Sequence, residues 1–203
     1  MGPNGSGKST LVQAIIGNPQ YELSSRSSIV LNKKKIHTLS PDKRANLGLG
    51  VTFQSPLALQ GVSVFQLLRL AKKDMDVLKL YKSIEKIADV LKIKKELIDR
   101  PLNDGASGGE RKKLEILQMA VLDPSLIFFD EIDTGVDVDS LKTIFTFLKE
   151  FKKKKTFVFI THYSKIFTYL KLDVVLIMKE GRIVKEGGYE VVDIVDRKGY
   201  EAF

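Results

Sequence analysis

The sequence predicts an α/β fold in which a mixed, largely parallel sheet is interrupted by an inserted helical subdomain. Three observations lead to this fold class. A glycine-rich segment, Gly2–Thr10, runs directly into an apolar stretch of helical character. Short β-branched and aromatic runs alternate with helical stretches in the first and last parts of the chain. Between Ser63 and about Leu122, apolar residues recur at helical spacing instead.

The segment Gly2–Thr10 reads GPNGSGKST and matches the P-loop pattern of Gly, four residues and Gly-Lys-Ser/Thr. This pattern predicts backbone N–H groups that surround a β-phosphate at the N-terminus of the following helix. The Lys8 ammonium should reach the β- and γ-phosphates, and the Ser9 hydroxyl should ligate Mg²⁺. We therefore expect a nucleotide-binding loop made by Asn4, Gly5, Ser6, Gly7, Lys8, Ser9 and Thr10.

The elements after this loop alternate between strand and helix. Ser28–Leu31 is predicted as a strand, with Lys33–Lys35 at a turn. Ser40-Pro41 should begin a short helix as its N-cap and first residue, and Gly48 should end it. Gly50–Phe53 is then predicted as a short strand.

From Ser63 to Leu122 we expect helices only, closed by a helix over Gly108–Leu122. Apolar residues there follow a helical period: Val64, Leu67, Leu68 and Ala71, then Val77, Leu80, Ile84, Ile87, Ala88 and Leu91. We expect one domain over 1–203, with residues 1–54 and 123–203 as the nucleotide-binding catalytic core and 55–122 as the helical subdomain.

Strands are predicted again over 126–130, 156–161 and 173–178, separated by helices. Glu180-Gly181 should join the last of these to Arg182–Glu186 in a hairpin. Apolar strands joined by helical crossovers favour a mostly parallel sheet that is covered on both faces.

Polar residues stand at the ends of these strands. Ligands of such sheets bind just beyond the carboxyl ends of the strands, so Gln54, Asp130 and His162 should converge on the nucleotide. Asp130 should hold Mg²⁺ through a water, and Glu131 should accept a proton from the water that attacks the γ-phosphate. We interpret Asp133 as support for the following turn and not as a second base.

A second motif, Ser107-Gly108-Gly109-Glu110, lies one helix upstream of the run LIFFDE that contains Asp130 and Glu131. Gln54 precedes it, Asp137 closes the Thr134–Asp137 turn, and His162 follows the next strand. This ordered set resembles the signature, Walker B and associated motifs of ATP-binding cassette (ABC) ATPases over essentially the whole chain.

The resemblance implies an ABC ATPase with a P-loop core, using ATP and Mg²⁺. It implies the catalytic residues Glu131, His162 and Gln54, with Ser9, Gln54 and Asp130 around the metal. In this family the signature residues complete the ATP site of a second chain, which implies an ATP-dependent homodimer. The implied signature contacts come from Ser107, Gly108, Gly109 and Glu110.

Within the ABC ATPases, the chain resembles the SufC family, which serves iron–sulfur cluster assembly. The similarity rests on ASGGERKKLEILQ at 106–118, DEIDTGVD at 130–137, THY at 161–163 and GGY at 187–189. It implies partners of the SufB/SufD scaffold type, which would hold the cluster. The segment FQSPLALQGVS at 53–63 departs from the family's usual FQYPVEIPGVS.

Other classes of function stay open or are disfavoured. The competing hypothesis is the nucleotide-binding subunit of an ABC transporter, which would share every catalytic residue. A cassette acting on DNA or ribosomes would carry long insertions that this sequence lacks. The net charge of +8 arises largely from the lysine runs 33–35 and 152–155, which have no interleaved aromatics, so we expect no direct nucleic-acid binding.

Composition sets two further expectations. No apolar run approaches the ~20 residues that span a bilayer, and we expect a cytoplasmic subunit without direct membrane insertion. The absence of cysteine excludes Cys-ligated zinc or iron–sulfur centres within this chain.

Met1 stands where the resembled family has the last residue of the strand that enters the P-loop. We therefore expect the 203-residue form to be truncated or to begin at a misplaced start. The missing segment would include the aromatic residue that stacks on adenine. Without that strand we expect weak ATP binding and a tendency to aggregate.

Overall fold

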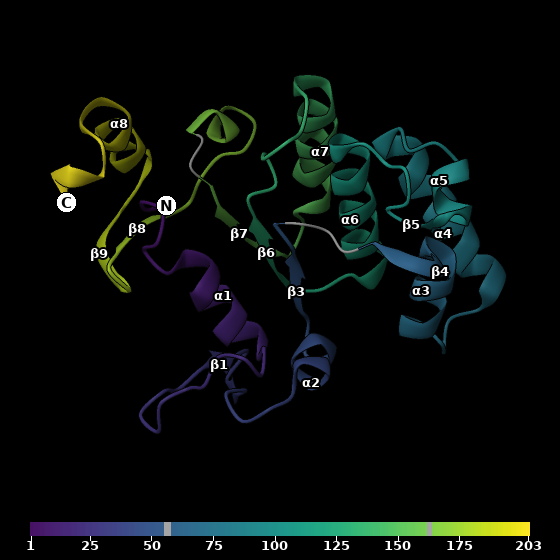
Figure 1. Ribbon diagram of the computed structural model, residues 1–203, viewed down its shortest axis with the longest axis horizontal. Helices are drawn as coiled ribbons and strands as arrows, with labels where there is room; N and C mark the ends of the chain where they lie inside the picture. The colour runs from purple at the N-terminus through teal and green to yellow at the C-terminus, as the bar shows by residue number, and fades with distance from the viewer. Residues whose placement is uncertain (55–57, 162–163) are drawn as a thin grey trace. The chain divides into compact units, whose positions relative to one another are not determined.

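The computed structural model describes residues 1–54, 58–161 and 164–203, which form two units. The first unit comprises Met1–Leu49 and Phe159–Phe203, and the second comprises Gly50–Val158 (Figure 1). The predicted α/β fold is confirmed. Within the described residues, the observed sheets are a three-stranded sheet of order β3-β6-β7 and the two-stranded pairs β1-β2, β4-β5 and β8-β9.

The first unit carries the P-loop and the C-terminal part of the chain. Its elements are α1 (Lys8–Ile16), β1 (Val30–Leu31), β2 (Lys34–Lys35), α2 (Pro41–Asn46), η1 (Ser164–Thr168), β8 (Val175–Lys179), β9 (Arg182–Gly187), α8 (Tyr189–Lys198) and η2 (Tyr200–Ala202). The β8-β9 hairpin turns at Glu180 and Gly181, which both have positive φ, as predicted for a tight two-residue turn.

Met1 lies alongside β8 and bonds to it in the manner of a parallel strand. Its terminal ammonium donates to the Leu176 carbonyl at 2.7 Å, and the Met178 N–H donates to the Met1 carbonyl at 2.8 Å. Met1 also packs against a buried apolar cluster of β8 and α8, made by Val175, Ile177, Val191 and Val192. The residue that leads into the P-loop is therefore anchored to this hairpin.

Arg44 joins α2 to the C-terminal end of α1. The side chain is 3% exposed, and its guanidinium donates to four backbone carbonyls. The acceptors are Ala14 and Ile15 in α1, at 2.9 and 2.7 Å, together with His37 and Leu39 at 2.9 and 2.8 Å. Because the last carbonyls of a helix have no partner inside the helix, this guanidinium completes the end of the P-loop helix.

The second unit contains the predicted helical segment and the strands that end at candidate site residues. Its elements are β3 (Leu49–Thr52), β4 (Leu59–Ser63), α3 (Val64–Ala71), α4 (Val77–Leu91), α5 (Glu96–Asp99), β5 (Pro101–Leu102), α6 (Gly108–Leu122), β6 (Leu126–Asp130), α7 (Val138–Phe151) and β7 (Thr156–Ile160). The unit boundaries fall inside β3 and β7.

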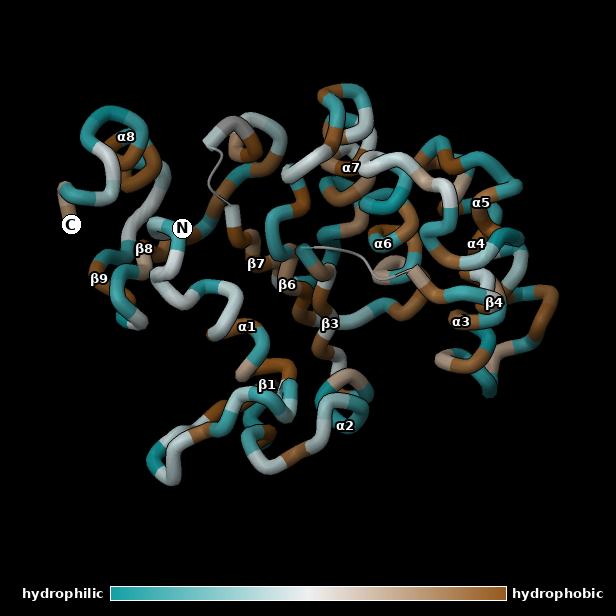
Figure 2. Tube along the Cα trace, in the orientation of Figure 1, coloured by the Kyte–Doolittle hydropathy of each residue, from teal (hydrophilic) through white to brown (hydrophobic). Residues whose placement is uncertain are grey.

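The core of this unit lies around α6, which contacts α3, α4 and α7. Figure 2 shows β6 and β7 in the brown of apolar residues, while brown and teal alternate along α4 and α7. The ring of Phe129 on β6 meets Phe157 on β7 edge-to-face at 5.2 Å. The α4 side chains that face the core are fully or almost fully buried: Leu80, Ile84, Ala88 and Leu91.

Several sequence predictions were wrong in detail. Lys34–Lys35 forms β2 and not a turn, because Asn32 and Lys33 take the positive-φ turn positions. The expected all-helical segment contains β5, whose two residues pair antiparallel with β4. Two apolar residues at element ends, Ala71 and Val77, are exposed and outside the core.

Within the described ranges, none of the helices is both long enough and apolar enough to cross a membrane.

Replacing Arg44 with Lys should lower the free energy of unfolding by about 2–4 kcal/mol, as measured by urea denaturation. A lysine ammonium cannot reach four carbonyls spread over two segments, so buried acceptors would lose partners. Arg26→Lys, at an exposed position in the same unit, is the matched control and should change stability by less than about 0.5 kcal/mol. Equal stability of the two variants would contradict this role of Arg44.

Candidate functional site

The P-loop is built around the buried side chain of Lys8. The Lys8 ammonium donates to the Gly2 and Pro3 carbonyls, both at 2.8 Å, and lies 3.4 Å from the Ser6 hydroxyl. Lys8 is the first residue of α1, and only 9% of it is exposed. The positive charge is therefore fixed at the N-terminus of a helix, where anions bind favourably.

Glycines allow this loop to curl. Gly5 and Gly7 have φ of 76° and 95°, a region that residues with a Cβ rarely adopt. Gly2 is required for a different reason, since a Cβ there would lie 2.1 Å from the Met178 carbonyl of β8. The Ser6 carbonyl accepts from the Gly181 N–H at 3.0 Å. The loop is thus held against the β8-β9 hairpin within the first unit.

The motif Ser107-Gly108-Gly109-Glu110 begins α6, as predicted. Ser107 is the N-cap, and its hydroxyl oxygen accepts a hydrogen bond from the Glu110 N–H at 3.3 Å. The Glu110 carboxylate accepts from the Ser107 N–H at 2.9 Å, which completes a capping box. The Ser107 N–H and hydroxyl, and then Lys94, hold the pKa of Glu110 below its ordinary value. Ser107 and Gly108 are exposed, so this helix N-terminus can meet an external anion.

The two glycines of this motif also permit a close approach of backbone. A Cβ on Gly108 would lie 2.3 Å from the Gly135 carbonyl, and a Cβ on Gly109 would lie 2.6 Å from the Ser140 hydroxyl. Asp137 caps α7 by accepting from the Ser140 N–H at 2.8 Å, and this bond lowers the Asp137 pKa. The start of α6 is therefore packed onto the turn that follows Glu131.

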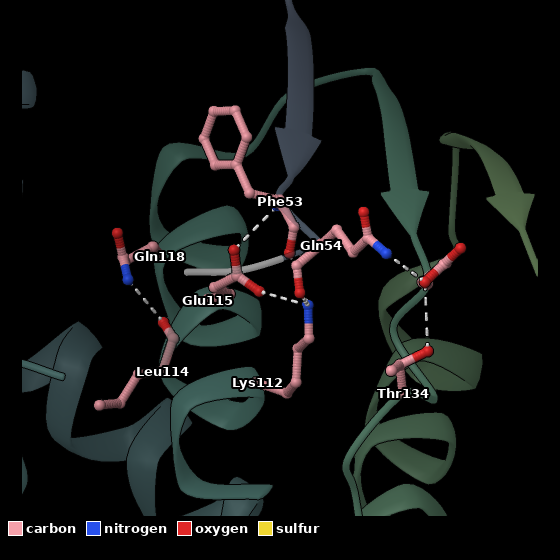
Figure 3. A network of polar contacts seen from close by, with 8 residues as sticks. Phe53, Gln54, Lys112, Leu114, Glu115, Gln118 and Thr134 are labelled. Carbon is pink, nitrogen blue, oxygen red and sulfur yellow. Dashed lines mark hydrogen bonds and ion pairs between the residues drawn. The ribbon is translucent and has the colours of Figure 1, made fainter. Parts of the chain in front are cut away.

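Gln54 and Glu131 meet beyond the ends of β3 and β6. In Figure 3 the arrows of these two strands point the same way, and the Gln54 side chain extends from the end of β3 toward the end of β6. The amide nitrogen donates to Glu131 Oε2 at 2.7 Å, and the Thr134 hydroxyl lies 3.4 Å from the same oxygen. Asp130, the last residue of β6, is 4% exposed. Glu131 has a φ of 48°, a left-handed conformation that is uncommon for glutamate.

The structure adds two residues that the sequence analysis missed. Lys112 and Glu115, three residues apart on α6, form an ion pair with 3.2 Å between Nζ and Oε2. The Phe53 N–H donates to Glu115 Oε1 at 2.9 Å, and Lys112 donates to the Phe53 and Gln54 carbonyls at 2.6 and 3.2 Å (Figure 3). Burial raises the pKa of Glu115, and the nearby Lys112 ammonium and Phe53 N–H oppose that rise. A charged run after a helix start ordinarily indicates a solvated face, so no local pattern distinguished this pair.

The structure brings together some of the predicted residues. Gln54 contacts Glu131, and Ser107 contacts Glu110. The P-loop belongs to the first unit, whereas Gln54, Glu131 and the signature motif belong to the second. The predicted His162 lies outside the described residues. Among the described residues, no cluster of three or more His, Cys, Asp or Glu side chains could hold a metal ion.

Sequence comparisons place this chain among known proteins. Residues 1–134 match the family described as ABC transporter. The chain is 37% identical to the probable ATP-dependent transporter ycf16 of Cyanophora paradoxa, covering 99% of this chain and 81% of that protein. It is 38% identical to vegetative protein 296 of Bacillus subtilis (99% and 80%), and 36% identical to the chloroplastic ABC transporter I family member 6 of Arabidopsis thaliana (100% and 62%).

Solved structures agree with this placement. A nucleotide-free ATP-binding cassette from an ABC transporter superposes with a TM-score of 0.77 at 26% identity, covering 98% of this chain and 84% of that chain. The structure of an ABC transporter cassette in its ADP conformation gives a TM-score of 0.77 at 27% identity, with 100% of this chain and 84% of that chain covered. From its P-loop, its capped signature helix and these similarities, the chain belongs to the ABC transporter family, as an ATP-binding cassette ATPase domain.

Proposed function

We propose that this chain binds and hydrolyses ATP with Mg²⁺. The observation that carries the proposal is the bond between Gln54 and Glu131, which fixes a carboxylate one residue beyond the buried Asp130. The P-loop lysine, held on two carbonyls of its own loop, would supply the positive charge for the phosphates. The related cassette with 27% identity was solved in its ADP conformation, which supports an adenine nucleotide as ligand.

The proposed Mg²⁺ ligands suit that ion by their chemistry. Ser9, Gln54 and Asp130 offer a hydroxyl, an amide oxygen and a carboxylate, all hard oxygen donors. The Gln54 nitrogen is the atom directed at Glu131, so its amide oxygen is the atom left to face a metal or a water. When bound, the ion would neutralise charge on the β- and γ-phosphates.

The proposed hydrolysis needs an attacking water that is correctly oriented and one general base that activates it. Glu131 would accept a proton from, or polarise, the attacking water, and Gln54 would orient that carboxylate and the water. Thr134 lies near the same carboxylate oxygen and would limit its rotation. We propose that His162 contacts the γ-phosphate, as the histidine at this place does in the family.

We further propose that two chains close around two ATP molecules. The exposed N-terminus of α6, with Ser107 and the two glycines after it, is suited to a γ-phosphate that comes from outside its own chain. Such a dimer would have two-fold symmetry, and hydrolysis would remove the phosphates that hold it closed.

The specific role that we propose is to move a SufB/SufD-type scaffold in the cytoplasm during iron–sulfur cluster assembly. The run ERKKLEILQ on α6 and the turn EIDTGVD support this role by their likeness to SufC. The cluster would be held by the partners, since this chain has no cysteine. The relatives from Cyanophora paradoxa and Arabidopsis thaliana are named as transporters, so a transporter subunit is the alternative.

Lys8→Ala should abolish ATP binding, because it removes the buried charge and its hydrogen bonds at the phosphate loop. Glu131→Gln should retain binding while hydrolysis falls by roughly 10²–10⁴, the usual contribution of a general base. Nucleotide titration and phosphate release measure the two effects. Lys153→Ala and Glu150→Gln, at exposed positions, serve as controls. Normal turnover by Glu131→Gln would refute the assignment of the base.

ATP and Mg²⁺ should convert the Glu131→Gln variant into a dimer, detected as a doubling of molar mass in light scattering. Adding Ser107→Arg should prevent this, because the larger side chain would block the partner's γ-phosphate. Ser25→Arg, on an exposed loop, should leave the dimer intact. A wild-type monomer whose specific activity does not depend on protein concentration would exclude the composite site.

The purified protein should bind a SufB/SufD-like scaffold complex, and its ATPase rate should then rise. The Lys8→Ala variant should still bind the scaffold without ATPase activity, which separates docking from turnover. Affinity purification from the native cell, followed by partner identification, measures the first claim. Recovery of an integral membrane permease instead would favour the transporter subunit.

A further inference from the structure

The buried Lys112–Glu115 pair on α6 holds the backbone that carries Gln54. The two side chains are 4% and 9% exposed. Three hydrogen bonds join them to the chain beyond β3, at the Phe53 N–H, the Phe53 carbonyl and the Gln54 carbonyl. Both polar groups of Phe53 and the carbonyl of Gln54 are thus bonded to one helix (Figure 3).

Packing of the Phe53 side chain does not explain this arrangement. Phe53 is 42% exposed, so its side chain contributes little packing beside the three backbone bonds. Nor does stability require such a pair, because buried ion pairs are often replaced by apolar residues without loss of stability. Burying this ion pair is costly, and its hydrogen bonds all go to one short segment. We therefore attribute the pair to a need to hold the backbone of that segment in a fixed position.

The segment held by the ion pair is also bonded to the proposed base, Glu131. The Gln54 backbone is fixed by Lys112, and the Gln54 amide donates to Glu131 at 2.7 Å. A shift of about 1 Å at a catalytic group can lower a rate 10²-fold, so the position of this backbone matters for turnover.

We propose that Lys112 and Glu115 are positioning residues for ATP hydrolysis, acting by holding the Phe53–Gln54 backbone so that the Gln54 amide meets Glu131. This inference rests on the proposed ATPase function. Both side chains bond to the segment that carries Gln54, so their removal should affect turnover more than ATP binding.

The first measurement is steady-state ATPase kinetics of Lys112→Met and Glu115→Ala with Mg²⁺ and ATP. In both variants kcat should fall by about tenfold or more, while KM for ATP changes by less than about threefold. Lys95→Met is the matched control, because it breaks a more exposed Lys–Glu pair of the same unit, between Lys95 and Glu85. An unchanged kcat in the folded variants would overturn the proposal.

A double-mutant cycle with Gln54→Ala separates positioning from general destabilisation. If Glu115 acts through Gln54, Glu115→Ala should have little further effect on kcat once Gln54 is alanine. Glu115→Gln keeps an acceptor for the Phe53 N–H and should recover part of the activity, which also covers the case that Glu115→Ala fails to fold. If the losses of kcat in Gln54→Ala and Glu115→Ala were fully additive in the double variant, Lys112 and Glu115 would have only a structural role and the inference would be rejected.

Hydrogen exchange of the Phe53 amide tests the same contacts without any ATPase assay. Exchange should be slow in the wild type and at least tenfold faster in Glu115→Ala, with Lys95→Met unchanged. If the wild type failed to hydrolyse ATP, the proposed function would fail while this measurement still reported on the contacts. Equal exchange in wild type and Glu115→Ala would show that the pair does not hold the segment.

Discussion

Backbone carbonyls in loops and at a helix end are bound by buried cationic side chains at three places in the part of this protein that the structure describes. Among the described residues, Lys8, Arg44 and Lys112 are the buried basic side chains, and each donates to at least two carbonyls. A buried carbonyl without a partner is costly, and a charged donor stabilises it more than a neutral one. These cations therefore fix the P-loop, the end of its helix and the segment that carries Gln54.

The three sites differ in how their charge is balanced. Lys112 has Glu115 beside it, whereas the four acceptors of Arg44 described above are all carbonyls. The planar guanidinium of Arg44 can serve acceptors on several sides at once, which suits a helix end and two loop carbonyls. Lys8 lies at the N-terminus of α1, where anionic phosphate would be the natural counterion.

The sequence was informative where a motif is contiguous and apolar runs are long. It predicted the P-loop, the helix Gly108–Leu122, the strand Leu126–Asp130 and the hairpin at Glu180, because local patterns determine all of these. It also placed Gln54 and Glu131 at strand ends, and in the structure the Gln54 amide donates to the Glu131 carboxylate.

The remaining features depend on long-range packing. Arg44 reads as a solvent-facing residue of a short helix, and its burial follows only from the position of α1. The run ERKKLE gives no local sign that Lys112 and Glu115 point inward, because their partners lie about 60 residues away. The strand β5 has only two residues, Pro101–Leu102, which is too short for any periodicity.

The contact between Gly108 and the Gly135 carbonyl has a consequence for how this protein can evolve. A Cβ at position 108 would clash with the Gly135 carbonyl in the turn that follows Glu131. Because this carbonyl is a backbone atom, no side-chain rotation relieves the clash, and the turn itself would have to move. We therefore expect a larger residue at position 108 to be tolerated only together with a changed turn. Across homologues, residue size at position 108 should covary with the conformation of the turn at 135, and motifs usually treated as separate should diverge together.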